Sequence, residues 1–356
     1  MNSDFLVTLL QFIGALVALI IIHELGHFFA SKLFKVEVEE FGIGFPPRIA
    51  TLFEAGGTKF TLNAIPLGGF VRPKGENDPT VPGGLAAASP WVRLVVLSAG
   101  PIANLLVGVL LYAFVIQRVG MPDQTKVRII DVPENSPAAE ANLMSGDLIL
   151  KVNDTIIDGT DAMQRAIDAN LGKPVTLLIQ RGEETMEVSL TPRLDPPEGQ
   201  GPIGIVMGNP TRPVSVIQSL PAGVVAVYYH VVALIELPVQ MIQGNVSPEQ
   251  GRLVGIKGMF DIYQEVTQDE PTPGTPAGID VPLFFAQITI SLGLLNLFPF
   301  PALDGGRILF TLPEIIIRRR VPPEYENWIN LIGFGILLML LIYVNLQDFI
   351  SPAPIP

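Results

Sequence analysis

The chain has 356 residues, of which 49% are hydrophobic and 16% charged, and its mean hydropathy is +0.45. Soluble domains usually carry about 25% charged residues, so this composition indicates an integral membrane protein. The net charge of −12 leaves no basic surface for phosphates. It therefore argues against nucleic acid as a partner, and we expect no nucleotide partner either. The chain has no cysteine, which excludes disulfides and thiolate chemistry.

Apolar stretches of about 20 residues can cross a bilayer as helices. The first begins near the N-terminus but lacks a basic region and a small-residue cleavage site, so we do not expect a cleavable signal peptide. Four such stretches predict four transmembrane helices, at roughly 5–30, 92–116, 281–298 and 328–346.

Lysine and arginine in the short loops predict the orientation of these helices, because such residues gather on the cytoplasmic side. The loop after the first helix and the loop after the third are both basic, so both are expected to be cytoplasmic. The two termini and the long 119–280 segment are then extracytoplasmic. The basic residues are Lys32, Lys35, Arg48, Lys59, Arg72, Lys74 and Arg93 in the first region, and Arg307, Arg318, Arg319 and Arg320 in the second.

Residues 214–242 are apolar but are interrupted by Pro221, Glu236 and Pro238. They form either a fifth span or a helix at the membrane interface. We favour the interfacial helix, because a fifth span would reverse the direction that the basic loops predict for the 281–298 helix. The Pro- and Gly-rich residues 269–280 predict a linker.

Two segments between the predicted membrane helices are β-rich. Residues 36–72 alternate apolar and polar side chains with Gly and Pro turns, which predicts hairpins. Residues 124–195 predict a small domain of strands and short helices. One helix is expected after Ser136 as its cap, another is expected to be closed by Gly172, and a hairpin turns near Gly182.

The pattern His-Glu-x-x-His occurs inside the first apolar stretch, at His23, Glu24 and His27. On a helix the two imidazoles lie on one face, one turn apart, and can bind one metal ion. Zinc lowers the pKa of a coordinated water to about 7, and the adjacent glutamate can take its proton. Two histidines bonded between helices are the structural alternative. Three ionisable groups in one membrane helix favour a functional site.

A catalytic zinc needs a third protein ligand, and Asp304 is the candidate. It lies in the segment Asn296–Arg307 (NLFPFPALDGGR), where Pro299 and Pro301 end the third helix and a Gly pair lets the backbone turn. The alternative is that Asp304 only caps the following helix. Eighteen residues separate Phe5 from His23, which is about 27 Å of helix, and 23 residues separate Val281 from Asp304, again close to one hydrocarbon thickness. Both motifs should therefore reach the cytoplasmic side of the membrane.

These motifs resemble the site-2 protease family of intramembrane zinc metalloproteases, particularly bacterial regulator-of-sigma-E-type proteases with a single PDZ domain. The likeness rests on HELGH, NLFPFPALDGG, the AGPIAN segment that ends at Asn104, and the 124–195 domain. It implies His23, His27 and Asp304 as Zn2+ ligands and Glu24 as the general base. It further implies that Asn296 contacts substrate; Asn104 lines the same cavity or makes a bond between helices, two alternatives that stay open.

The resemblance predicts a polytopic α-helical membrane protein with four transmembrane helices, a membrane-associated β-hairpin segment and one extracytoplasmic PDZ-like α/β domain. The expected segments are a first membrane helix (1–35), a β-rich cytoplasmic or re-entrant segment (36–90), a second membrane helix (91–118), the PDZ-like domain (119–205), interfacial helices and a linker (206–280), a third membrane helix with the aspartate motif (281–310), and a loop with the fourth helix and tail (311–356).

The expected activity is zinc-dependent cleavage of single-pass membrane proteins within or near the bacterial inner membrane. The resemblance implies anti-sigma factors or remnant signal peptides as substrates, cleaved in regulated proteolysis, with the lipid bilayer as the other partner. The PDZ-like domain either binds a new C-terminus or excludes bulky substrates. Two rival functions are a metal-binding scaffold without hydrolysis, against which Glu24 argues, and a metal transporter, for which the second and fourth helices carry too few polar residues.

Overall fold

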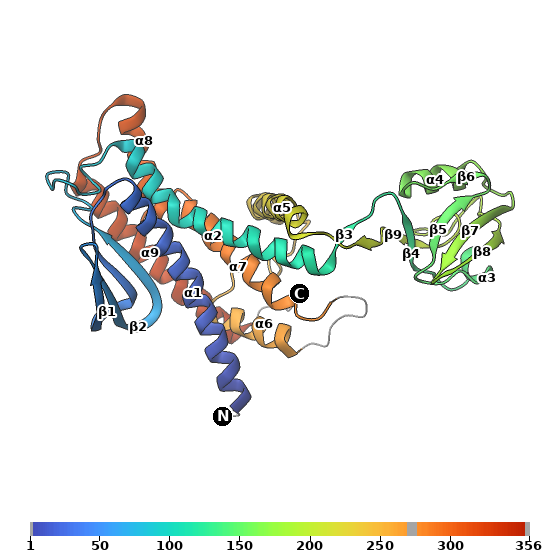
Figure 1. The fold of residues 1–356 in the computed structure, drawn as a ribbon, viewed down its shortest axis with the longest axis horizontal. Helices are drawn as coiled ribbons and strands as arrows, with labels where there is room; N and C mark the ends of the chain where they lie inside the picture. The colour runs from blue at the N-terminus through green and yellow to red at the C-terminus, as the bar shows by residue number, and fades with distance from the viewer. Residues whose placement is uncertain (1–2, 269–275, 353–356) are drawn as a thin grey trace. The chain divides into compact units, whose positions relative to one another are not determined.

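Figure 1 shows a computed structural model of the chain, which describes residues 3–268 and 276–352. The chain divides into two compact units. We call Met1–Val115 together with Val216–Pro356 the membrane unit, and Ile116–Ser215 the β-domain. The predicted linker at 269–280 lies mostly outside the described residues.

The membrane unit is built mainly of long apolar helices. They are α1 (Ser3–Leu33), α2 (Pro90–Val119), α5 (Val216–Ile242), α6 (Ile256–Gln268), α7 (Asp280–Leu297), α8 (Asp304–Ile317) and α9 (Pro323–Ile350). Among the described residues, five helices are long and apolar enough to cross a membrane: α1, α2, α5, α7 and α9. The four predicted spans are all among them. Because α5 also qualifies, length and composition do not confirm the number four.

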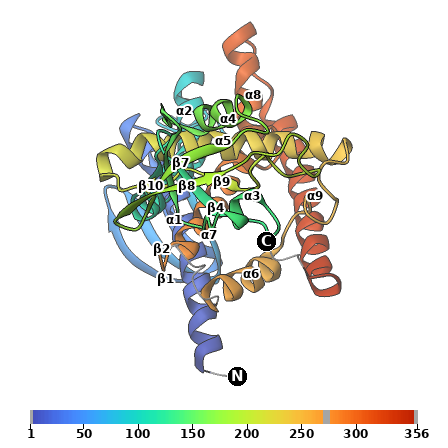
Figure 2. The same cartoon turned by 90° about the vertical axis from the view of Figure 1, so that its right-hand side faces the viewer.

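Helix α5 runs across the other long helices. It is seen almost end-on in Figure 1, where α1 and α2 are seen from the side, and it crosses the view in Figure 2. It packs closely on α2 at Gly223, where a Cβ would lie 2.6 Å from the carbonyl oxygen of Val109.

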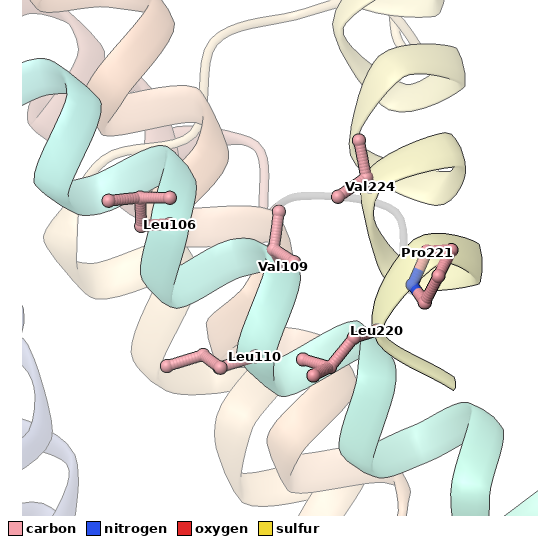
Figure 3. Close-up of a pocket in the computed structure, with 6 residues that line it drawn as sticks. All are labelled: Leu106, Val109, Leu110, Leu220, Pro221 and Val224. Atoms are coloured by element: carbon pink, nitrogen blue, oxygen red, sulfur yellow. The ribbon is translucent and has the colours of Figure 1, made fainter. Parts of the chain in front are cut away.

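An apolar groove lies between α2 and α5 (Figure 3). Its lining residues are Leu106, Val109, Leu110, Leu220, Pro221 and Val224. None of these side chains can transfer a proton or bind a metal ion, so catalytic chemistry is not located in this groove.

Helix α1 packs against α2 with little space between their backbones. A Cβ at Gly26 would collide with the carbonyl oxygen of Ala99, and one at Gly293 of α7 would lie 2.9 Å from the carbonyl oxygen of Pro101. Small residues allow such close approach between membrane helices. This close packing places the face of α1 that carries His23 and His27 against α2.

Two long antiparallel strands, β1 (Val38–Ala55) and β2 (Thr58–Pro73), form the sheet of the membrane unit. Both strands are irregular, so residues 40–43 pair with 59–62 on one side and with 69–72 on the other. The β-rich character predicted for this region is confirmed. We call residues 69–72 the outer strand, because no further strand pairs with them among the described residues; this side of the sheet lies along α1.

The end of α9 is tied to the start of α6 by one buried carboxylate. Asp348 has an exposed fraction of 0% and accepts hydrogen bonds from the backbone N–H groups of Gly255 (2.8 Å) and Gly258 (2.9 Å). Arg252 donates a third, from Nη2 at 2.9 Å. The first N–H groups of a helix have no partner within the helix, and a carboxylate satisfies them while matching the helix dipole.

The β-domain contains a short-stranded sheet with two short helices. Its elements are β3 (Met121–Pro122), β4 (Val127–Asp131), α3 (Pro137–Glu140), β5 (Leu148–Val152), β6 (Thr155–Ile156), α4 (Thr160–Asp168), β7 (Val175–Arg181), β8 (Glu184–Leu190), β9 (Val206–Gly208) and β10 (Thr211–Arg212). The strand order is β8-β7-β5-β4-β9, with β6 paired to β5 and β3 paired separately to β10.

The sequence predicted most of these local elements correctly. Ser136 caps α3 by accepting a hydrogen bond from the N–H of Ala139 at 3.0 Å, and the β7–β8 hairpin turns at Gly182, which has a φ of +63°. Helix α4 ends at Asp168, and the predicted cap Gly172 follows in the next turn with a φ of +71°. Alternating apolar residues form the core: Val127 and Ile129 of β4 and Leu177 and Ile179 of β7, the two strands on either side of β5, are fully buried.

The buried carboxylate of Asp147 in the β-domain has hydrogen-bond partners on both oxygens. Asp147 accepts two hydrogen bonds of 2.7 Å from Arg181 and one of 2.9 Å from the N–H of Met144. Burial by itself would raise the pKa of the Asp147 carboxyl, but the bonds from Arg181 and Met144 outweigh it, and the pKa lies below its usual value.

Candidate metal centre

Helix α1 brings the two histidines of the HELGH motif to one face. No proline or internal break interrupts α1 between Ser3 and Leu33, so His23 and His27 are one turn apart. Their Nε2 atoms lie 3.2 Å from each other. Both rings are largely buried, with exposed side-chain fractions of 9% and 12%.

The third predicted ligand comes from the start of α8. The chain leaves α7 at Leu297 and turns, and Asp304 is the first residue of α8. Leu303 holds the N-cap position, so Asp304 is not the cap; its Oδ2 lies 3.1 Å from His23 Nε2 and 3.3 Å from His27 Nε2. The structure thus brings together three side chains that the sequence separates by up to 281 positions.

The Gly pair after Asp304 acts differently from what we predicted. Neither Gly305 nor Gly306 has a positive φ; the residue in the left-handed region is Ala302, with a φ of 74°. A Cβ at Gly305 would instead collide with the carbonyl oxygens of Leu297 and Phe298. The glycines therefore allow the start of α8 to lie directly against the preceding turn, which positions Asp304.

The three donor atoms fit a zinc ion. Donors about 2.0 Å from a tetrahedral metal are about 3.3 Å from one another, and the three separations here are 3.1, 3.2 and 3.3 Å. Two imidazoles and one carboxylate are a common catalytic zinc set. Space at the donors depends on Gly100 of α2, because a Cβ there would collide with His27 Nε2 and lie 2.8 Å from His23 Nε2.

The other nitrogen of each imidazole faces α2. His27 Nδ1 lies 2.8 Å from the carbonyl oxygen of Val96, to which it can donate. His23 Nδ1 lies 3.2 Å from Nδ2 of Asn104. Asn104 has an exposed fraction of 0%, so the structure places this predicted cavity residue behind His23. Its predicted place in the lining of the substrate cavity stays a prediction.

Glu24 lies beside the outer strand of the β1–β2 sheet. The backbone N–H of Val71 makes a hydrogen bond to its carboxylate. A Cβ at Gly69 would lie 3.3 Å from Glu24 Cγ, so a residue with no side chain stands at the contact. The potential proton acceptor thus lies beside the strand that has no second strand partner among the described residues.

Asn296 makes no hydrogen bond to His23, His27 or Asp304 in the structure. It lies in the last turn of α7, half-buried, and its Nδ2 donates to the carbonyl oxygen of Leu292 at 2.9 Å. Its predicted role in contacting substrate likewise stays a prediction.

Sequence reasoning missed the contributions of the backbone to this centre. The carbonyl of Val96 and the N–H of Val71 are present in any residue type, so no sequence signal marks them. Gly100 was noticed as part of AGPIAN, but only the fold reveals that it faces the imidazoles.

Comparison with known proteins decides the family. The model of peptidase family M50 matches residues 11–340. The chain belongs to peptidase family M50. A Clostridium perfringens protein, named as a candidate zinc metalloprotease, is 31% identical over 337 residues, which cover 94% of this chain and 96% of that protein. The chloroplastic membrane metalloprotease ARASP of Arabidopsis thaliana is 30% identical, over 97% of this chain and 79% of its own.

Membership of family M50 confirms the predicted resemblance to site-2 proteases and the predicted enzyme class. This chain is a multi-pass membrane protein and a zinc metalloprotease, with Zn2+ as its cofactor. Among solved structures, the PDZ domain of an SdrC-like protein from Listeria monocytogenes matches 23% of this chain and 87% of its own length, at 21% identity and a TM-score of 0.21.

Proposed function

We propose that this M50 peptidase cleaves single-pass membrane proteins within or near the bilayer, with zinc held by His23, His27 and Asp304. The observation that carries the proposal is the triangle of donor atoms 3.1–3.3 Å apart, with Glu24 next to it on α1. When bound, zinc polarises the scissile carbonyl and makes a water molecule acidic enough to lose a proton near neutral pH.

Glu24 is the proposed general base. It takes the proton of the attacking water and delivers it to the nitrogen of the leaving peptide. The bond from Val71 and the contact at Gly69 orient its carboxylate toward the outer strand. A fixed carboxylate beside the reacting carbonyl lowers the entropic part of the barrier.

The outer strand is the proposed binding place for the substrate backbone. A peptide bond in a transmembrane helix is shielded by side chains, and its carbonyl is already bonded, so the helix must unwind before attack. The unwound segment needs hydrogen-bond partners in a lipid environment. Residues 69–72 have one unpaired edge among the described strands, and addition of the substrate as a strand would satisfy its N–H and C=O groups beside Glu24. Asn296 is proposed to contact the same segment.

We further propose four membrane spans, with α5 at the membrane interface. Its direction across α1 and α9 supports this arrangement (Figure 2), since spans run broadly along the membrane normal. Both termini and the β-domain are then extracytoplasmic, in the inner membrane of a bacterium. The segments keep the boundaries predicted from the sequence, except that the β-domain extends to Ser215 and includes β9 and β10. The β-domain acts as a PDZ-like module that selects substrates by a free C-terminus or by size. Anti-sigma factors and remnant signal peptides are the proposed substrates, in regulated proteolysis.

A cleavage assay combined with metal analysis tests this function. Purified protein in detergent should contain one zinc per chain and cut a single-pass model substrate, and a chelator should stop cleavage. Glu24→Gln should keep zinc and lose at least about 100-fold in rate, because general-base catalysis contributes 10²–10⁴-fold. If Glu24→Gln cuts at the wild-type rate, the mechanism is wrong; if wild-type protein binds zinc but cuts no membrane substrate, the metal-binding scaffold is the better account.

A further inference from the structure

Asn104 is a buried polar side chain that the mechanism above does not use. It lies on α2 with an exposed fraction of 0%, its Nδ2 is 3.2 Å from His23 Nδ1, and its Oδ1 has no hydrogen-bond partner among the described residues. We propose that Asn104 is a positioning residue whose amide oxygen accepts the Nδ1–H of His23 and thereby presents the Nε2 lone pair to zinc. This inference rests on the ligand roles proposed above.

The two nitrogens of an imidazole have different roles when the ring binds a metal ion. A neutral histidine carries one N–H and one lone pair, so a metal ion on Nε2 requires the proton on Nδ1. The atom facing Nδ1 must then be an acceptor. Asn104 offers one acceptor, Oδ1, and the amide oxygen and nitrogen have nearly the same size. A half-turn of the amide therefore brings Oδ1 to the position 3.2 Å from His23 Nδ1 without displacing its neighbours.

His27 supports this assignment because its Nδ1 has an acceptor of fixed identity. The carbonyl oxygen of Val96, 2.8 Å away, can only accept. Val96, Gly100 and Asn104 recur at intervals of four residues and share one face of α2. That face supplies an acceptor for His27, an open space at both Nε2 atoms, and an acceptor for His23.

A bond that merely joins two helices would not require this side chain. The contact between α2 and α7 at this position uses the backbone carbonyl of Asn104, which accepts from Thr289 Oγ1 at 3.1 Å. The amide of Asn104 is directed to α1 instead. Partners of this kind orient metal-binding histidines and raise their basicity, and their loss typically weakens metal binding 10–100-fold.

Zinc affinity, measured by competition with a chelator in detergent, tests the proposal. Asn104→Leu keeps the approximate size but lacks an acceptor, and should bind zinc about 10–100-fold more weakly. Asn104→Asp restores the acceptor and should bind at least as tightly as wild type. Thr289→Val is the matched control: it removes a buried hydroxyl at the same helix contact without touching His23, and should leave zinc affinity unchanged. An Asn104→Leu affinity within twofold of wild type, or an Asn104→Asp affinity as low as that of Asn104→Leu, would overturn the proposal.

A second measurement needs no variant of Asn104. The chain has 3 histidines, so a proton–nitrogen correlation spectrum of zinc-loaded protein labelled with ¹⁵N-histidine contains three imidazoles. His230→Gln removes the one outside the centre. His23 should carry its proton on Nδ1, in slow exchange with water; a proton on Nε2 of His23 would refute the assignment. Zinc binding that depends on Asp304 would still support the ligand set, so the two failures are distinguishable.

Discussion

Large apolar side chains are buried in the core of the β-domain but exposed on the outer helices of the membrane unit. In the β-domain, Ile129, Leu177 and Ile179 are 0% exposed and form the core. In the membrane unit, Leu331 and Met339 of α9 are 60% and 65% exposed. Removal of apolar surface from water stabilises the β-domain, whereas lipid is itself apolar and leaves the outer faces of membrane helices free to remain uncovered.

Buried polar groups differ between the units as well. Asp147 of the β-domain is matched by Arg181, with 2.7 Å between carboxylate and guanidinium. The membrane unit brings together His23 and the half-buried Asp304, with the fully buried amide of Asn104 beside His23. A polar group is expensive in lipid, so a cluster that fold stability alone does not require marks a functional site. The exposed side chains of each unit therefore indicate whether it lies in water or in lipid. The buried polar groups indicate whether it carries out chemistry.

Replacement of the proposed ligand carboxylate should have the largest effect. Asp304→Asn removes the negative charge from the donor triangle, and zinc affinity should fall by more than about 100-fold, beyond the 10–100-fold typical of residues that only support a ligand. Cleavage should be lost with it. Metal analysis of the purified variant checks this, with the exposed Asp280→Asn as a control that keeps zinc. Unchanged zinc content in Asp304→Asn would assign the third ligand to another residue.

Truncation of the β-domain core should destabilise that unit alone. Ile179→Ala removes three buried carbons and should cost about 3 kcal/mol, since large-to-small core changes cost 2–5 kcal/mol. The β-domain transition in calorimetry of the whole chain should move to lower temperature, while zinc content stays at the wild-type value. Loss of zinc from Ile179→Ala would contradict the expectation that this substitution affects the β-domain alone.

A lysine placed at one exposed apolar position in each unit tests whether that surface faces lipid or water. Met339→Lys puts a charge near the middle of α9, where it should cost about 3 kcal/mol in a bilayer. Ile156→Lys changes a β-domain residue that is similarly exposed, 68% against 65%, and should shift stability by less than about 0.5 kcal/mol. Yield and thermal stability of the two variants in lipid nanodiscs measure the difference. Equal effects would mean that this face of α9 does not contact lipid.

Acid should weaken the β-domain through Asp147. Its pKa is lowered in the folded state, because the bonds from Arg181 and Met144 outweigh burial, so the unfolded chain takes up the proton first. The stabilisation is therefore fully present above the ordinary Asp value of about 3.9 and is lost as the pH falls through the lower folded pKa. The melting temperature of the β-domain should fall less steeply between pH 5 and pH 3 in Asp147→Asn than in wild type. The exposed Asp195→Asn should keep the wild-type slope, and identical slopes in all three proteins would exclude the mechanism.

Much of the fold was predictable from the sequence because local rules decide it. Apolar runs of membrane length gave α1, α2, α7 and α9, and alternation with turn residues gave the β1–β2 sheet and the β7–β8 hairpin. The sequence left open whether α5 spans the membrane or lies at its interface. Composition shows that a helix is apolar but does not show in which direction it runs. The end of α4 at Asp168, ahead of the predicted cap Gly172, has the same origin, since helix ends depend on their neighbours.

The sequence by itself determined the kind of chemistry: a helical His-Glu-x-x-His pattern and one isolated aspartate specify donor types that suit zinc. Only the tertiary structure decided that α8 brings Asp304 to 3.1 Å from His23, that Gly100 leaves room at the imidazoles, and that Val96 and Asn104 stand behind them. Residue identity fixes what a side chain can donate or accept. Distances between residues far apart in the chain are set by the packing of whole helices, which no local pattern encodes.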